Sequence, residues 1–248
     1  MKNVFPLLGL TLSASVPLLA QPAAEQTKPV KKSAAKPAAE KTVVRTGGTA
    51  FLRVLHAMPG GPSVDVYGGS VKVASNLGFK NISDYMEVKS GKSNFKVVGA
   101  GKTDPAVVTD SMSLVKGKFY TLAISGKQAP TLTSINESNG KEMPDKARVR
   151  VVHLAPGAPA VLITAPSERA ASGYTKFLPK ALEYGKSGSK TANPMTTKLQ
   201  IRTEDGKIVK ETDEIKLEAG NRYSAFAVGE VGANGAGAFE VIVKPAAK

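Results

Sequence analysis

The two histidines of this chain, His56 and His153, are the side chains best suited to exchange protons near neutral pH, because cysteine is absent. They stand 97 residues apart, at equivalent positions of two similar segments. A catalytic pair is not normally duplicated in this way. We interpret each histidine as the end of a core strand, its ring hydrogen-bonded to the backbone of a Pro-rich turn. A metal site would need both rings to converge, or a carboxylate such as Asp65 to join one of them. We therefore expect no catalytic residue, no metal and no cofactor.

Other catalytic motifs are incomplete in this sequence. Two Gly-Lys-Ser tripeptides, at 91–93 and 185–187, resemble the end of a phosphate-binding loop but lack the glycine five residues earlier. There is no G-x-S-x-G motif, and pairs of carboxylates are too common to be specific for a glycosidase. We expect a non-enzymatic protein. The alternative is a metal-binding protein, or a hydrolase with its site in the polar stretch 165–197.

The elements that would position these residues come from an internal repeat. AFLRVLHAMPGGPSVDVY (50–67) aligns with ARVRVVHLAPGAPAVLIT (147–164), and SMSLVKGKFYTLAISG (111–126) aligns with EIKLEAGNRYSAFAVG (214–229). The offset grows from 97 to 103 residues, so the second copy has six additional residues, which we place in 165–197.

Hydrophobic residues alternate with a period of two inside each copy. Leu52, Val54 and His56 share one face of the opening strand and Arg53 lies on the other, and the second copy repeats this with Arg150. Further strands are expected at 63–67, 93–98, 107–115 and 119–125, with counterparts at 160–164, 198–203, 208–217 and 223–228. Short strands separated by Gly- and Pro-rich turns predict an all-β fold of two tandem antiparallel sandwiches.

The pattern L-x-x-G-x-x-Y occurs once in each copy. It consists of Leu114, Gly117 and Tyr120 in the first copy, and of Leu217, Gly220 and Tyr223 in the second. The spacing fits a tyrosine corner, in which a tyrosine hydroxyl returns to upstream backbone at the crossover between two sheets. These six residues are therefore expected to be structural.

The first residues indicate export. Lys2 precedes an uncharged, mostly apolar stretch, which predicts a signal peptide over 1–20, with cleavage after Ala20 or alternatively after Ala24. An Ala-, Lys- and Pro-rich linker follows over 21–46. We then expect one β-sandwich domain over 47–136, a connector over 137–146 and a second domain over 147–248. No later segment is apolar enough to span a membrane, so the mature protein should lie in the periplasm, on the cell surface or outside the cell.

The net charge of +14 is divided among three parts of the chain, so that each expected sandwich is only mildly basic. Residues 1–46 contribute +5, residues 47–146 contribute +4 and residues 147–248 contribute +5. Neither sandwich shows a basic stripe interleaved with aromatic residues, so a nucleic-acid partner is not expected.

The block R-V-x-H-x-x-P-G-x-P-x-V, with the later G-x-x-Y-[ST] strand, resembles tandem copies of the secreted bacterial "domain of unknown function 4397" family, from about Thr49 to Lys244. This resemblance implies immunoglobulin-like sandwiches at the cell envelope without an assigned activity. The family's V-D-V-Y motif is matched around Asp65, whereas Leu162 replaces the aspartate in the second copy. The wider layout is also similar to AlgF, the periplasmic accessory protein of alginate O-acetylation, which would imply an adaptor in an exopolysaccharide complex.

The Pro-Gly turns would present the same surface twice. We expect binding turns formed by two groups of residues: His56, Met58, Pro59, Gly60 and Asp65 in the first copy, and His153, Pro156, Gly157 and Pro159 in the second. The expected partner is an envelope protein or a polysaccharide. If the similarity to AlgF holds, that partner is a membrane O-acyltransferase complex.

Overall fold

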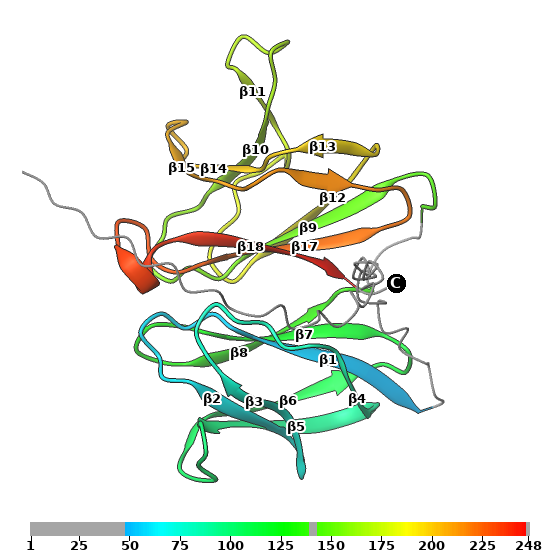
Figure 1. Ribbon diagram of the computed structural model, residues 1–248, viewed down its shortest axis with the longest axis vertical. Helices are drawn as coiled ribbons and strands as arrows, with labels where there is room; N and C mark the ends of the chain where they lie inside the picture. The colour runs from blue at the N-terminus through cyan, green and yellow to red at the C-terminus, as the bar shows by residue number, and fades with distance from the viewer. Residues whose placement is uncertain (1–47, 139–142, 247–248) are drawn as a thin grey trace, which may run out of the picture. The chain divides into compact units, whose positions relative to one another are not determined.

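The predicted all-β fold is confirmed. The computed structural model describes residues 48–138 and 143–246, which consist of strands, turns and one short 3₁₀ turn, η1 (Gly235–Gly237) (Figure 1). Within these residues, no helix is long and apolar enough to cross a membrane. The predicted signal peptide and linker lie outside the described part of the chain. The described residues form one compact unit, and the predicted domain boundaries stay a prediction.

The first copy forms two four-stranded sheets. Their orders are β4-β1-β7-β8 and β3-β2-β5-β6. The strands are β1 (Thr49–His56), β2 (Val64–Gly68), β3 (Val71–Leu77), β4 (Met86–Lys89), β5 (Gly91–Gly99), β6 (Ala106–Leu114), β7 (Phe119–Ser125) and β8 (Thr131–Asn136). β1 and β7 run parallel, whereas the other ladders of this copy are antiparallel.

The second copy repeats this arrangement, except that one of its strand pairs is divided into two shorter pairs. Its sheets have the orders β12-β9-β17-β18 and β11-β10-β14-β15, and a separate pair β13-β16 extends the second of these layers. The strands are β9 (Ala147–His153), β10 (Leu162–Pro166), β11 (Tyr174–Lys176), β12 (Ser187–Ala192), β13 (Met195–Thr197), β14 (Gln200–Arg202), β15 (Ile208–Glu211), β16 (Ile215–Leu217), β17 (Arg222–Val228) and β18 (Glu240–Ala246). β9 and β17 are parallel, like β1 and β7.

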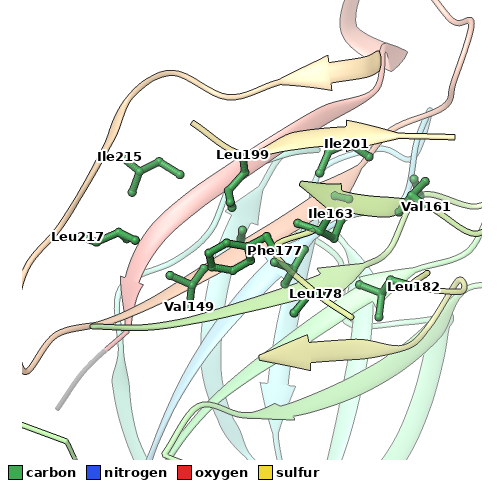
Figure 2. Close-up of a cluster of buried hydrophobic side chains, with 14 of the residues drawn as sticks. Val149, Val161, Ile163, Phe177, Leu178, Leu182, Leu199, Ile201, Ile215 and Leu217 are labelled. Carbon is green, nitrogen blue, oxygen red and sulfur yellow. The ribbon is translucent and has the colours of Figure 1, made fainter. Parts of the chain in front are cut away.

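Each copy has its own apolar core between its sheets. In the first copy, Leu52 and Val54 of β1 meet Val66 of β2 and Phe95 of β5, all of them buried. Figure 2 shows the corresponding core of the second copy, where the labelled side chains surround Phe177. Burying these apolar surfaces is the main stabilising contribution to each sandwich.

A third apolar cluster joins the two copies. Its members come from the outer faces of the β1-containing and β9-containing sheets: Leu55, Ala57, Ala123, Ile135, Val152, Leu154, Phe226, Val228 and Ile242. Alternation along β1 thus buries both faces of the strand, with Val54 in the core of the first copy and Leu55 in this junction.

The strand predicted over 208–217 is wrong as one continuous element. It divides into β15 and β16, and residues 212–214 lie between them. Thr212 causes the interruption, because its hydroxyl accepts a hydrogen bond from Leu199 N–H at 3.0 Å and its own N–H donates to Leu199 O at 2.9 Å. The equivalent strand of the first copy, β6, pairs with β5 along its length with one register shift.

Candidate functional site

Both predicted histidines are fully buried and hold the turns that follow their strands. Nδ1 of His56 accepts a hydrogen bond from Met58 N–H at 3.4 Å, which leaves the proton on Nε2 to be donated to Pro62 O at 3.0 Å. His153 repeats the pattern with Ala155 N–H at 3.3 Å and Pro159 O at 3.2 Å. Burial lowers the pKa of both imidazoles, which favours the neutral form that these bonds require.

Each histidine also contacts an aromatic ring that the sequence reasoning did not single out. Phe79 lies edge-on to His56, and Tyr184 lies edge-on to His153, with centroids 6.1 Å apart in both pairs. Phe79 lies between β3 and β4, and Tyr184 lies at the equivalent place between β11 and β12. Both nitrogens and the ring of each histidine therefore interact with other parts of the fold.

The predicted binding turns offer little accessible surface. Met58, Pro59 and Pro156 are buried, whereas Gly60, Gly157 and Pro159 are at least partly exposed. Gly60 and Gly157 have φ values of 71° and 78°, a conformation that glycine adopts without strain. Ligand binding at these turns stays a proposal, restricted to their exposed tips.

Asp65 is buried, and its carboxylate is hydrogen-bonded by other residues of the first copy. Its carboxylate accepts hydrogen bonds from Lys72 Nζ and Asn76 N–H, both at 2.7 Å, and from Gly101 N–H at 3.2 Å. The Lys72 ammonium and these amides lower the pKa of Asp65 to about 2. Asp65 thus joins three segments of its sheet, and the structure does not bring it together with either histidine imidazole.

The L-x-x-G-x-x-Y residues occupy equivalent places in the two copies. Tyr120 Oη accepts a hydrogen bond from Val115 N–H at 3.0 Å, and Tyr223 Oη accepts one from Glu218 N–H at 3.1 Å. Gly117 and Gly220 have φ values of 70° and 72° at the intervening turns. Leu114 and Leu217 are buried in the two cores.

A buried ion pair lies where the β1 sheet meets the second copy, and the sequence reasoning missed it. Arg53 Nη2 donates to Glu137 Oε1 at 2.7 Å, and Arg53 Nη1 donates to Pro245 O of β18 at 3.0 Å. Thr121 and Tyr85 also donate hydrogen bonds to the Glu137 carboxylate. The only sequence signal was an arginine on the outward face of an otherwise buried strand.

A hollow of about 350 Å³ opens beside edge strand β18 of the second copy. Its apolar wall contains Ile215, Val241, Val243 and Pro245, together with Tyr223. Its polar wall contains the four residues around the strand break: Thr212, Asp213, Glu214 and Lys216. Apolar and hydrogen-bonding groups therefore face the same space, as in many ligand sites.

The hollow follows from the difference between the copies. The break after β15 leaves Asp213 and Glu214 exposed beside β18. In the first copy, continuous β6 covers the matching place, and Tyr120 is buried there whereas Tyr223 is partly exposed. None of the predicted site residues except Tyr223 lines this hollow.

Within residues 48–138 and 143–246, no group of three or more His, Asp or Glu side chains is arranged to hold a metal ion. From the sequence, a histidine together with Asp65 was the combination that a metal site would need. Asp65 is instead bound by Lys72 and backbone amides.

The fold and these repeated turns define a class of paired β-sandwich proteins. Residues 50–164 match the family described as "Domain of unknown function (DUF4397)". The match confirms the predicted family resemblance over the first copy and the opening strands of the second. No curated protein matches this chain.

Solved structures that match this chain have low sequence identity to it and low TM-scores. The CBM26-family module CBMbc of Amy13K from Eubacterium rectale, in complex with maltoheptaose, has 11% identity and a TM-score of 0.24, with 81% of this chain and 98% of that chain covered. A candidate cell adhesion protein from Bacteroides ovatus has 13% identity and a TM-score of 0.25, with 78% and 95% covered. Another candidate from Parabacteroides distasonis has 9% identity and a TM-score of 0.21, with 82% and 99% covered.

Proposed function

We propose that this chain is a non-enzymatic, exported binding protein of the bacterial envelope, which holds a segment of polysaccharide in the hollow beside β18. The observation that supports this most directly is the hollow itself, where an aromatic side chain and aliphatic side chains lie opposite carboxylates. Sugar rings have both apolar C–H faces and hydroxyl groups, so they suit a site of this mixed character.

The roles of the lining residues follow from their chemistry. Tyr223, Val243 and Pro245 supply apolar surface for a ring face. Asp213 and Glu214 accept hydrogen bonds from sugar hydroxyls, and Lys216 donates to them. The Tyr223 hydroxyl is engaged with Glu218 N–H, so the ring is held in place before a ligand arrives.

Binding is tested by titrating the full chain with neutral and acidic oligosaccharides and following backbone amide shifts by NMR. Maltoheptaose and oligogalacturonate are suitable probes. We expect saturable shifts at residues 212–216 and 241–244. Asp213→Asn should weaken the affinity about tenfold, because a hydrogen bond between a carboxylate and a ligand contributes roughly 1.5 kcal/mol or more.

The first copy offers a matched control. Asp110 stands at the place of Asp213 in the repeat and is also exposed, but it lies on the continuous strand β6. Asp110→Asn should leave the affinity unchanged. Equal effects of both substitutions, or ligand-induced shifts only at the turn tips around Gly60 and Gly157, would refute binding in the hollow.

The alternative is an adaptor role like that of AlgF, in which the partner is a membrane O-acyltransferase complex. Its structural support is the junction between the copies, which joins two sandwiches into one unit. A pull-down from envelope extract with the mature protein from Gln21 discriminates the two roles. Recovery of a membrane acyltransferase favours the adaptor, and recovery of polysaccharide alone favours the binding protein.

A further inference from the structure

Three arginines lie close together on the face of the β9 sheet that is turned away from its core. Val149 and Val151 of β9 point into the core, so Arg148 and Arg150 point to the opposite face. Arg222 of β17 is the direct neighbour of Arg148 in the parallel ladder. The hollow lies on the core side of the same sheet, because Tyr223 alternates with Arg222 along β17.

The second copy keeps the arginine of the buried ion pair but not its carboxylate. Arg150 corresponds to Arg53 in the repeat. Glu137 lies next to Phe119 at the end of the β7–β8 ladder, and its N–H donates to Phe119 O at 2.9 Å. At the same place in the β17–β18 ladder, Arg222 pairs with Ala246. A methyl group thus replaces the carboxylate that neutralises Arg53.

Glu137 cannot serve Arg150 as well. Its carboxylate accepts hydrogen bonds from Arg53, Thr121 and Tyr85, and Arg222 reaches only its backbone carbonyl, at 3.5 Å. Glu87 of β4 is exposed on the outer face of the neighbouring sheet, opposite Phe51, and has interactions of its own.

Arg150 is partly buried, and its guanidinium makes no hydrogen bond or ion pair with the residues that the structure describes. Arg148 and Arg222, by contrast, each have interactions of their own. Burial and the charges of Arg148 and Arg222 lower the pKa of Arg150, whereas Glu137 acts in the opposite direction. A guanidinium that is partly removed from water and has no direct ion pair is costly even with Glu137 nearby, and a bound anion would reduce that cost.

We infer that Arg150 is the centre of an oxyanion site that takes a carboxylate, sulfate or phosphate group. The planar guanidinium can bind two oxygens of such a group at once. Ser189 of β12 and Ser224 of β17 flank Arg150 in the two adjacent strands and place hydroxyl groups on the same face. Arg148 and Arg222 add positive charge without having to contact the ligand.

The test uses the full chain with two probes, inorganic phosphate and oligogalacturonate, at low ionic strength. NMR follows the Arg150 side-chain Nε–Hε signal, and calorimetry measures the affinity. We expect one saturable site that weakens as salt is added. Binding of phosphate alone assigns the site to a small or phosphorylated ligand, whereas tighter binding of oligogalacturonate assigns it to an acidic glycan.

Matched variants separate this site from general charge attraction. Arg150→Gln should weaken binding at least tenfold, and Arg150→Lys should restore part of it. Arg169→Gln removes the same charge from an exposed turn and should change the affinity less than twofold. Asp213→Asn should leave anion binding intact, so failure of the hollow and failure of this site remain distinguishable.

Two outcomes would overturn the inference. One is an equal loss of binding in Arg150→Gln and Arg169→Gln, and the other is the absence of a saturable Arg150 shift with both probes. If Arg150→Gln proves too unstable to measure, the Nε–Hε titration of the unmodified chain decides the question alone.

Discussion

Arg53 Nη2 lies 2.7 Å from Glu137 Oε1, across 84 positions of the sequence, and both side chains are almost completely buried. The same guanidinium donates to Pro245 O on the last strand of the second copy. One side chain therefore connects the first strand of the first copy, its final segment and the final strand of the second copy.

Removal of Glu137 should be strongly destabilising. Glu137→Ala leaves the Arg53 charge buried without its counter-ion, which typically costs about 3–5 kcal/mol in the free energy of unfolding. Denaturant unfolding at neutral pH measures this change. Lys127→Ala is the control, because the Lys127–Glu230 pair also joins the two copies but is largely exposed. Its loss should cost less than about 1 kcal/mol. Similar losses for both variants would show that burial of the Arg53–Glu137 pair is unimportant.

Asp65 should make the stability sensitive to acid. Because its pKa is lowered from 3.8 to about 2 in the folded state, its contribution is fully present above about pH 4 and disappears as the pH falls from about 4 to about 2. Asp65→Asn should lower the free energy of unfolding at pH 7 by about 1–3 kcal/mol and flatten the acid dependence. Unfolding curves at several pH values test this. An unchanged pH profile in Asp65→Asn would contradict the prediction, and Asp110→Asn serves as the exposed control.

The histidines should add a second pH dependence at milder acidity. Burial lowers both imidazole pKa values below 6.5, so the unfolded chain takes up protons first as the pH falls below about 6.5. Stability should therefore decrease between about pH 7 and pH 5. His56→Gln and His153→Gln should each reduce this slope, as measured by unfolding at fixed temperature. Imidazole signals that titrate near pH 6.5 in the folded protein would disprove the explanation.

The hydroxyls of Tyr120 and Tyr223 should each contribute to the free energy of unfolding. Tyr120→Phe and Tyr223→Phe each remove one acceptor for a backbone N–H, and we expect a loss of about 1 kcal/mol, smaller for the more exposed Tyr223. Thermal unfolding of the two variants provides the measurement. Tyr184→Phe is a useful comparison, because the Tyr184 hydroxyl makes only a long contact of 3.4 Å with Ser125. A loss in Tyr184→Phe as large as in Tyr120→Phe would argue against a special role of the corner.

The sequence allowed the β fold to be predicted because alternation in β1, β7 and their counterparts directly reflects which face is buried. Strands such as β12, with the sequence SGSKTA, were not predicted, because they lie at a sheet edge and bury no continuous apolar face. The hydrogen bonds of the histidines could also be predicted, because each ring and the turn that it holds are neighbours in the chain. The Arg53–Glu137 pair and the Thr212 interruption depend on partners distant in sequence, and no local pattern indicates them.

The interruption at Thr212 is a main structural difference between the two copies. The first copy, closed by β6, retains the regular sandwich and supplies Arg53 and Glu137 to the junction. In the second copy the corresponding strand is interrupted, and the side chains at 213 and 214 are exposed and line the hollow. Under the proposed function, the first copy keeps the molecule folded while the exposed side chains at 213 and 214 meet the ligand, so substitutions there should change the affinity without lowering the free energy of unfolding.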